Sequence, residues 1–131
     1  MHKDYIKEKM YDKDAFSQWL GIEIIHIKND DCKLKMIVRK DMLNGFGIAH
    51  GGITYAFADS ALAFVSNALG NQAVSIETSI SHTKKVVVND ILTTTSYLIN
   101  KSKKFAIYSI EIHNQKMTLV ASFKGTVYYL D

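Results

Sequence analysis

The stretch from Asn44 to Asp59 brings an amide, an imidazole, two adjacent glycines and a carboxylate together within sixteen residues. Asp59 is the only charged residue of the apolar stretch 51–70. An unpaired carboxylate in apolar surroundings costs several kcal/mol, so such a group is usually neutralised, paired or part of a site. We therefore place Asp59 at the centre of a candidate site. The alternative is a structural carboxylate capped by hydroxyls such as Tyr55 or Ser60.

The glycines Gly51 and Gly52 follow His50 at the predicted start of a helix. Backbone N–H groups there can point at a ligand, and the helix dipole favours developing negative charge, as an oxyanion hole requires. Asp59 lies about two turns further on, too far to reach the terminus of its own helix. In a symmetric dimer it can instead face the glycine turn of the other chain. A carboxylate base or nucleophile combined with an oxyanion hole is the equipment for acyl transfer to water.

Two helices are predicted. The longer runs from Gly51 to about Leu69 and is apolar nearly all round, so other structure must cover it. The shorter spans residues 12–20 and is stopped by a glycine. Its apolar side is predicted to consist of Phe16, Trp19 and Leu20.

Six strands are predicted. Two, over 22–28 and 32–38, are joined by an Asn/Asp turn. Four more follow the long helix as an antiparallel meander, over 72–85, 90–100, 104–113 and 116–130. In the last of these, one face is predicted to carry Met117, Leu119, Ala121, Phe123, Val127 and Tyr129. One apolar helix beside one sheet indicates an α+β fold whose sheet curls around the helix. Long edge strands also favour a dimer with a continuous sheet.

The chain has 131 residues and a net charge of +3, which indicates one domain over 1–131, with residues 1–13 as an N-terminal extension. The single cysteine excludes an internal disulfide, and the wide spacing of the histidines argues against a metal site. Lysines in small groups suit a small anionic ligand or solubility better than nucleic acid. A carboxylate near the middle of 51–70 argues against a membrane span. Together these features favour a cytoplasmic protein.

The segment "LNGFGIAHGGITYAFADSALAFVSNALG" resembles the core of the hotdog-fold thioesterases, specifically the phenylacetate-degradation, PaaI-like acyl-CoA thioesterases. That family has an asparagine six residues before a His-Gly-Gly and an aspartate nine residues after the histidine, as this chain has. The flanking segments "WLGIEI", "AVSIETSISH" and "LVASFKGTVYY" also match. The resemblance covers the chain from about Asp14 onward. It implies a hotdog fold in which about six strands wrap around one long helix.

The resemblance also implies a role for each matching residue. Asp59 would be the general base that activates water or, less favoured, the nucleophile. The N–H of Gly51 would polarise the thioester carbonyl, with the Asn44 side chain close to the same oxygen. His50 would shape the loop and contact the carbonyl region, and Ser75 would help to hold the attacking water.

Substrate contacts follow from the same resemblance. Gly52 offers a second N–H group, and Tyr55 would line the acyl pocket or belong to the core. The phosphates of coenzyme A, which would be part of the substrate and not a cofactor, are expected near the basic residues Lys84, Lys85, Lys103 and Lys104. The protein would be a homodimer with its site at the interface, and a dimer of dimers.

This chain departs from the family after the central strand, where "HTKKVVVNDIL" replaces a segment that usually holds a proline and a Gly-Asp. Asn89 stands where glycine is usual, and Asn tolerates a positive φ. Two other functions stay open. The chain can be a non-catalytic acyl-CoA-binding module or, less favoured, an acyl-thioester hydratase or dehydratase.

Overall fold

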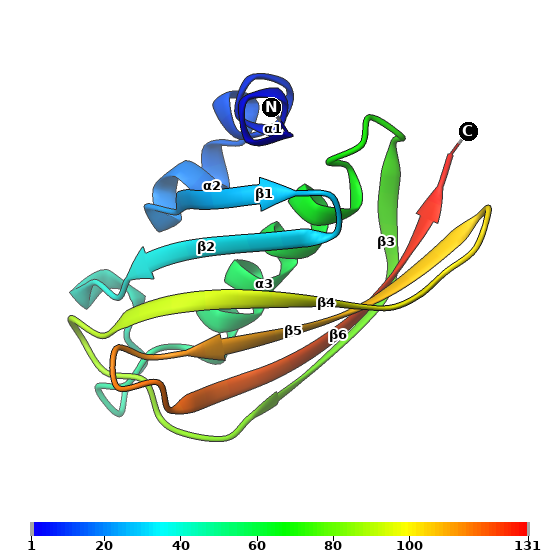
Figure 1. The fold of residues 1–131 in the computed structure, drawn as a ribbon. Coiled ribbons are helices and arrows are strands. Elements are labelled where there is room, and N and C mark those ends of the chain that lie inside the picture. Colours follow the sequence, from blue (N-terminus) through cyan, green and yellow to red (C-terminus); the bar gives the residue numbers. More distant parts are fainter. Residues whose placement is uncertain (1, 131) are drawn as a thin grey trace.

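Six antiparallel strands form one sheet that curls around helix α3 (Gly51–Ser66) in the computed structural model, which describes residues 2–130 (Figure 1). The strand order is β1-β2-β4-β5-β6-β3. The strands are β1 (Glu23–Lys28), β2 (Asp31–Ile37), β3 (Ala73–His82), β4 (Ile91–Lys101), β5 (Phe105–His113) and β6 (Leu119–Tyr129). This arrangement confirms the predicted α+β fold of about six strands around one long helix.

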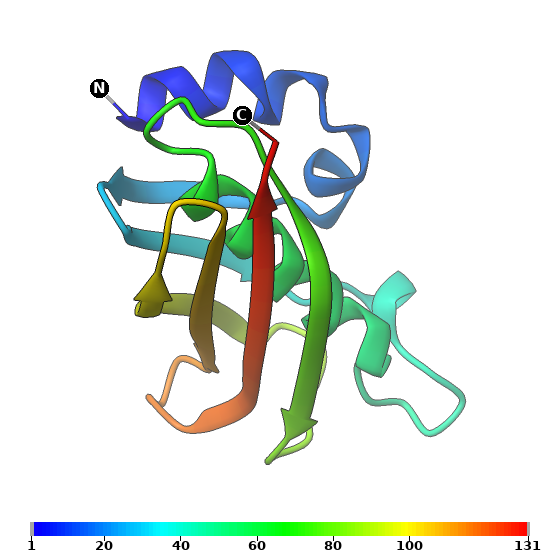
Figure 2. The ribbon, with the colours of Figure 1, turned by 90° about the vertical axis from the view of Figure 1, so that its right-hand side faces the viewer.

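The N-terminal segment lies across the β1 end of the molecule as α1 (His2–Lys9), η1 (Tyr11–Lys13) and α2 (Ala15–Leu20) (Figure 2). Ile6 of α1 is fully buried in the core. Asp14 caps α2 by accepting a hydrogen bond from the Ser17 N–H, and Gly21 ends the helix with a φ of 76°. That left-handed conformation favours glycine.

The predicted apolar side of the 12–20 helix is wrong for two of its three residues. Leu20 is fully buried, whereas Phe16 and Trp19 are 54% and 45% exposed. Their rings stack on each other, and the Arg39 guanidinium covers the Trp19 ring. The helix has only six residues, and the side it buries consists of Ser17 and Leu20.

The predicted four-strand meander is wrong for its first member. Strands β4, β5 and β6 are consecutive neighbours, but β3 pairs with β6 at the far edge of the sheet. The connection 83–90 is not a tight turn. It runs from the Val120 carbonyl, which binds the Thr83 N–H, to the end of β2, where Val38 exchanges hydrogen bonds with Asn89 and Asp90. The chain therefore crosses the end of the sheet before β4 begins.

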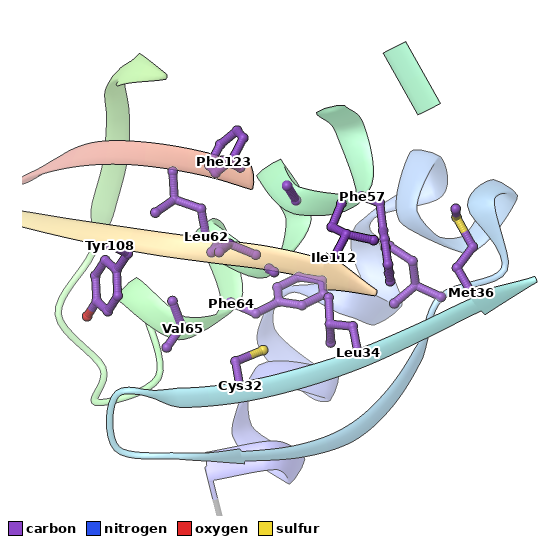
Figure 3. Packing of buried hydrophobic residues seen from close by; sticks show 14 of the residues in the cluster. Cys32, Leu34, Met36, Phe57, Leu62, Phe64, Val65, Tyr108, Ile112 and Phe123 are labelled. Atoms are coloured by element: carbon purple, nitrogen blue, oxygen red, sulfur yellow. The ribbon is translucent and has the colours of Figure 1, made fainter. Parts of the chain in front are cut away.

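Helix α3 fills the concave side of the sheet and supplies much of the core (Figure 3). Phe57, Leu62 and Phe64 are fully buried. Across from the helix, Gly125 of β6 leaves room for Leu62, because a Cβ there would lie 2.5 Å from Leu62 Cδ2. The helix ends at Ser66, earlier than predicted. Of the helices in residues 2–130, none has both the length and the apolar character to cross a membrane.

The beginning of β6 also differs from the prediction. Ala121, Phe123, Val127 and Tyr129 are buried on one face as expected. Met117 precedes the strand with a φ of 61° and is 73% exposed. It lies in the turn between β5 and β6, so it does not belong to the buried face.

Candidate active site at the start of the central helix

His50 is the N-cap of α3, and its Nδ1 accepts a hydrogen bond from the Gly52 N–H at 3.3 Å. The side chain therefore shapes the first turn, as the sequence predicts. The Gly51 N–H has no acceptor within residues 2–130, because it precedes the first hydrogen bond of the helix. This N–H group, at the positive end of the helix dipole, is free to bind a carbonyl oxygen.

Asn44 organises the loop that precedes α3. Its Oδ1 accepts hydrogen bonds from the N–H groups of Phe46 and Ile48, at 2.9 and 3.3 Å. Its Nδ2 has no acceptor in the described part of the chain, and Asn44 lines a pocket that Gly51 also lines. Asn44 thus forms a turn and also offers a free donor next to the helix terminus.

Two residues of this site were not identified from the sequence. His82, the last residue of β3, places its Nε2 2.7 Å from Thr54 Oγ1, which donates to the Gly51 carbonyl at 3.1 Å. The His82 ring also covers Gly51 Cα, since a Cβ at position 51 would lie 3.3 Å from His82 Cε1. The absence of a side chain at Gly51 is what permits this close packing.

These groups border a pocket of about 420 Å³ at the start of α3. Its wall includes Asn44, Gly51, Thr54 and His82, and the connection after β3 adds Lys84 and Lys85. The pocket therefore combines free N–H donors with two nearby ammonium groups. It is suited to a ligand that has a carbonyl group at one end and negative charge at the other.

Asp59 is half-buried on α3, and no hydrogen bond to its carboxylate forms within residues 2–130. Burial raises the pKa of this carboxyl group, and the nearby negative charge of Asp14 raises it further. The two hydroxyls considered as caps are occupied elsewhere, because Tyr55 bonds to Thr78 and Ser60 bonds to Ser17. The structural alternative based on these caps is therefore wrong.

Asp59 does not share a pocket with Gly51 of the same chain. Eight residues of α-helix separate them, which is a rise of about 12 Å along the axis. The stripe of α3 that carries Asp59 is only partly covered, and it consists of Gly52, Tyr55, Ala56, Asp59 and Ala63. This stripe leaves the carboxylate accessible from outside the chain.

The remaining predicted residues lie apart from the pocket. Ser75 is exposed on the edge strand β3, opposite Val127 of β6. Lys103 and Lys104 form the turn between β4 and β5, at the other end of the molecule from the β3–β4 connection (Figure 1). Lys103 borders a different pocket, near the end of α3. Within one chain, these three residues do not join the constellation around Gly51.

Comparison with known proteins places the chain among thioesterases. A sequence model described as the thioesterase superfamily matches residues 46–121. The acyl-coenzyme A thioesterase PaaI of Escherichia coli K12 is 36% identical over 116 residues, which cover 88% of this chain and 83% of that protein.

Solved structures agree with the sequence comparison. The structure of the E. coli PaaI protein from the phenylacetic acid degradation operon superposes with a TM-score of 0.95 at 32% identity, covering 99% of this chain and 94% of that one. A mutant of the phenylacetic acid degradation protein PaaI from Thermus thermophilus gives 0.85 at 33% identity, covering 89% and 100% of the two chains. These matches confirm the PaaI-like resemblance and the hotdog fold.

Proposed function

The chain belongs to the thioesterase superfamily as a PaaI-like hotdog enzyme, and on that premise we propose that it hydrolyses an aryl- or short- to medium-chain acyl-CoA to the free acid and CoA. The observation that supports this proposal most directly is Asp59. It is a half-buried carboxylate that accepts no hydrogen bond from residues 2–130, and its pKa is raised. Such a group is a stronger base than an exposed aspartate and suits proton abstraction from water.

The carbonyl oxygen of the thioester would bind at the start of α3. Gly51 and Asn44 both line the pocket there, and we propose that the free Gly51 N–H and the Asn44 Nδ2 donate to this oxygen. Because the helix dipole adds to these donors, the negative charge of a tetrahedral intermediate would be stabilised. His50 holds the turn in place through its bond to the Gly52 N–H.

The reaction then needs one water and no group beyond these. Asp59 takes a proton from water as the water oxygen bonds to the thioester carbon. The carbonyl electrons move to the oxygen bound by the Gly51 N–H, and they return as the carbon–sulfur bond breaks. The CoA thiolate leaves and takes the proton from Asp59, which gives the carboxylic acid and the thiol and restores the carboxylate base.

We assign the two halves of this site to different subunits of a homodimer. Asp59 is about 12 Å along the axis from the start of its own helix, and its stripe of α3 is only partly covered. Strand β3 is an unpaired edge on which Val74 and Ile76 are 42% and 55% exposed. Pairing of two β3 edges would continue the sheet and cover this apolar surface. We also propose that two such dimers associate to form a tetramer.

The other predicted roles fit this arrangement to different degrees. Lys84 and Lys85, which line the pocket, are proposed to bind the CoA phosphates. Ser75, on the β3 edge, is proposed to reach the attacking water once the second subunit is present. Lys103 and Lys104 could contact CoA only if it extended to the β4–β5 turn. A cytoplasmic location is also proposed, since the single buried cysteine suits a reducing compartment.

Thiol release from a panel of acyl-CoA esters tests the proposal, with wild type and Asp59→Asn compared side by side. Asparagine keeps the shape of the side chain and removes the base. We expect turnover of at least one ester and a loss of at least about 10²-fold in kcat for the variant, with the fold retained. Binding of the esters without cleavage by wild type would refute hydrolysis and favour the acyl-CoA-binding module.

Subunit complementation tests the shared site. Asp59→Asn and Asn44→Ala would each be inactive alone, but a mixed dimer would contain one intact site. After unfolding and refolding together, an equal mixture should regain about a quarter of wild-type activity, since half the dimers would be mixed and each would hold one intact site. A mixture that stays inactive, although both variants form dimers, would contradict a site made by two chains.

A further inference from the structure

Helix α3 begins with two glycines, and the proposed donor to the thioester carbonyl is the N–H group of the first. Glycine has the widest backbone freedom of all residues and is a weak helix former. The N–H groups of a first helical turn also have no partner within the helix. A donor stabilises developing charge best when its direction is fixed before the reaction. Gly51 therefore needs contacts from outside α3 that hold it in one orientation.

His82 provides one such contact through Thr54, by two linked hydrogen bonds. Thr54 Oγ1 donates to the Gly51 carbonyl at 3.1 Å and lies 2.7 Å from His82 Nε2. A carbonyl oxygen can only accept, so the single hydroxyl proton of Thr54 points to Gly51. His82 Nε2 must then carry a hydrogen and donate it to Thr54 Oγ1. Thr54 is 2% exposed, so water has little access to its hydroxyl group.

The His82 ring provides a second contact with the same glycine. A Cβ built on Gly51 would lie 3.3 Å from His82 Cε1, 3.8 Å from Nε2 and 4.0 Å from Nδ1, so this edge of the imidazole faces the Gly51 Cα. On the N-terminal side, the His50 carbonyl accepts a hydrogen bond from the Ile53 N–H at 2.9 Å, and that carbonyl shares a peptide group with the Gly51 N–H. The peptide group before Gly51, its Cα and its carbonyl group are thus each held. His82 supports the last two.

The backbone that carries His82 is itself fixed. His82 is the last residue of β3 and pairs with Ala121 of β6. At the next residue, the Thr83 N–H donates to the Val120 carbonyl at 2.9 Å, and the Thr83 hydroxyl donates to the Leu119 carbonyl at 2.7 Å. The imidazole therefore connects the start of α3 to the two strands at this edge of the sheet.

We propose that His82 is a positioning residue for the proposed hydrolysis: through Thr54 and by packing against Gly51, it keeps the Gly51 N–H directed at the thioester carbonyl. This inference rests on the proposed role of the Gly51 N–H. It assigns His82 no direct contact with the substrate. Because negative charge on the carbonyl oxygen develops in the transition state, a misdirected N–H lowers kcat much more than it weakens substrate binding.

Thr54→Val and His82→Phe test the two hydrogen bonds. Valine has the shape of threonine without the hydroxyl group, and phenylalanine keeps a flat ring against Gly51 without the N–H. In thiol release from acyl-CoA, each variant should lose about 10- to 100-fold in kcat, with KM within about twofold of wild type. Thr54→Ser keeps the hydroxyl group and should retain most of the activity. The double variant should be no slower than the slower single variant, because both changes break one connection.

Thr94→Val is the matched control for a loss of structure. Thr94 is also buried, and its Oγ1 accepts a hydrogen bond from the Leu34 N–H at 3.0 Å, which connects β4 to β2. This variant should lower Tm, as Thr54→Val does, but should leave kcat unchanged. A rise in KM with kcat unchanged in Thr54→Val and His82→Phe would overturn the proposal, because it would make these residues part of substrate binding. Additive losses in the double variant would also overturn it.

Backbone ¹⁵N relaxation of the protein without substrate gives a readout that does not depend on activity. Labelling with ¹⁵N-glycine limits the spectrum to the seven glycines, and the Gly51 signal is identified by its absence in Gly51→Ala. The order parameter of the Gly51 N–H should be about 0.85 in wild type and Thr54→Ser, and it should fall toward about 0.6 in Thr54→Val and His82→Phe. A fall supports the role of His82 even if no ester is cleaved, in which case only the proposed hydrolysis fails. An unchanged order parameter in both variants overturns that role whether or not the enzyme is active.

Discussion

Gly125→Ala should push α3 away from β6, because the added methyl group has no space. A Cβ at position 125 would lie 2.5 Å from Leu62 Cδ2 and 3.1 Å from Phe123 Cε1. Carbon atoms in contact are about 3.5–4.0 Å apart, so the overlap with Leu62 is on the order of 1 Å. Leu62 is fully buried and cannot turn toward solvent. Overpacking of this kind costs about 1–3 kcal/mol of folding free energy.

Thermal unfolding measures this cost. For a domain of this size, 1 kcal/mol corresponds to about 4 °C in Tm, so we expect Tm to fall by about 4–12 °C. A second variant identifies the cause. Leu62→Ala alone should be destabilised by about 2–5 kcal/mol because it leaves a cavity. In that background the new methyl group at position 125 partly fills the cavity, so Gly125→Ala should become neutral or stabilising.

The double-mutant cycle decides the outcome. A coupling free energy of about 1–3 kcal/mol between positions 62 and 125 would locate the strain at this contact. If Gly125→Ala lowered Tm equally in both backgrounds, the overlap with Leu62 would not be the cause. Asp59 precedes Leu62 by three residues on α3, so kcat should also fall in Gly125→Ala and recover in the double variant.

Three further outcomes are expected. Gly51→Ala should change the free energy of unfolding by no more than about 1 kcal/mol, because alanine reduces the conformational entropy of the unfolded chain. Its Cβ would lie 3.3 Å from His82 Cε1, so the start of α3 must shift and kcat for thiol release should fall at least about 10-fold. An unchanged kcat would contradict carbonyl binding there. Asp59→Asn should raise Tm at pH 7. The folded-state pKa of Asp59 lies above its unfolded value of about 4, so ionisation of the carboxyl group destabilises the folded wild type as pH rises from about 4 through the folded-state pKa. Asparagine stays neutral, so the increase in Tm should vanish below about pH 4. A Tm difference that does not vary with pH would refute the raised pKa. Asn67→Ala should lower the free energy of unfolding in urea by about 1–3 kcal/mol. The Asn67 side-chain amide accepts a hydrogen bond from the Ala73 N–H and donates one to the Ala63 carbonyl in the last turn of α3. An unfolding midpoint equal to that of wild type would count against this capping role.

The elements of this fold were predictable from the sequence, but the pairing of one strand was not. Apolar periodicity located α3, the paired strands β1 and β2, and the three strands β4 to β6, because each pattern depends on local burial. The place of β3 depends on the connection 83–90, which crosses the end of the sheet. It forms hydrogen bonds with Val120 of β6, with Ala49 before α3 and with Val38 just after β2. Nothing within that segment specifies those distant partners.

The candidate site was likewise predictable only where its residues lie close together in the sequence. Asn44, His50 and Asp59 were predicted together, because they are close in sequence and two of them shape the start of one helix. His82 reaches the site from β3, so only the folded chain brings it there. One signal for His82 was available: alternation from Thr78 through Ile80 to His82 puts the histidine on the strand face toward α3.

The order of strands in the sheet also sets an order for synthesis. Strand β3 precedes β4, β5 and β6 along the chain, yet its only partner within residues 2–130 is β6, the last strand to be made. At about 5–20 residues per second, β3 waits several seconds on the ribosome with both edges open. During that interval the helix that bears Asp59 is covered by an unfinished sheet. Premature release before residue 119 would therefore yield a chain prone to aggregate rather than a smaller folded domain.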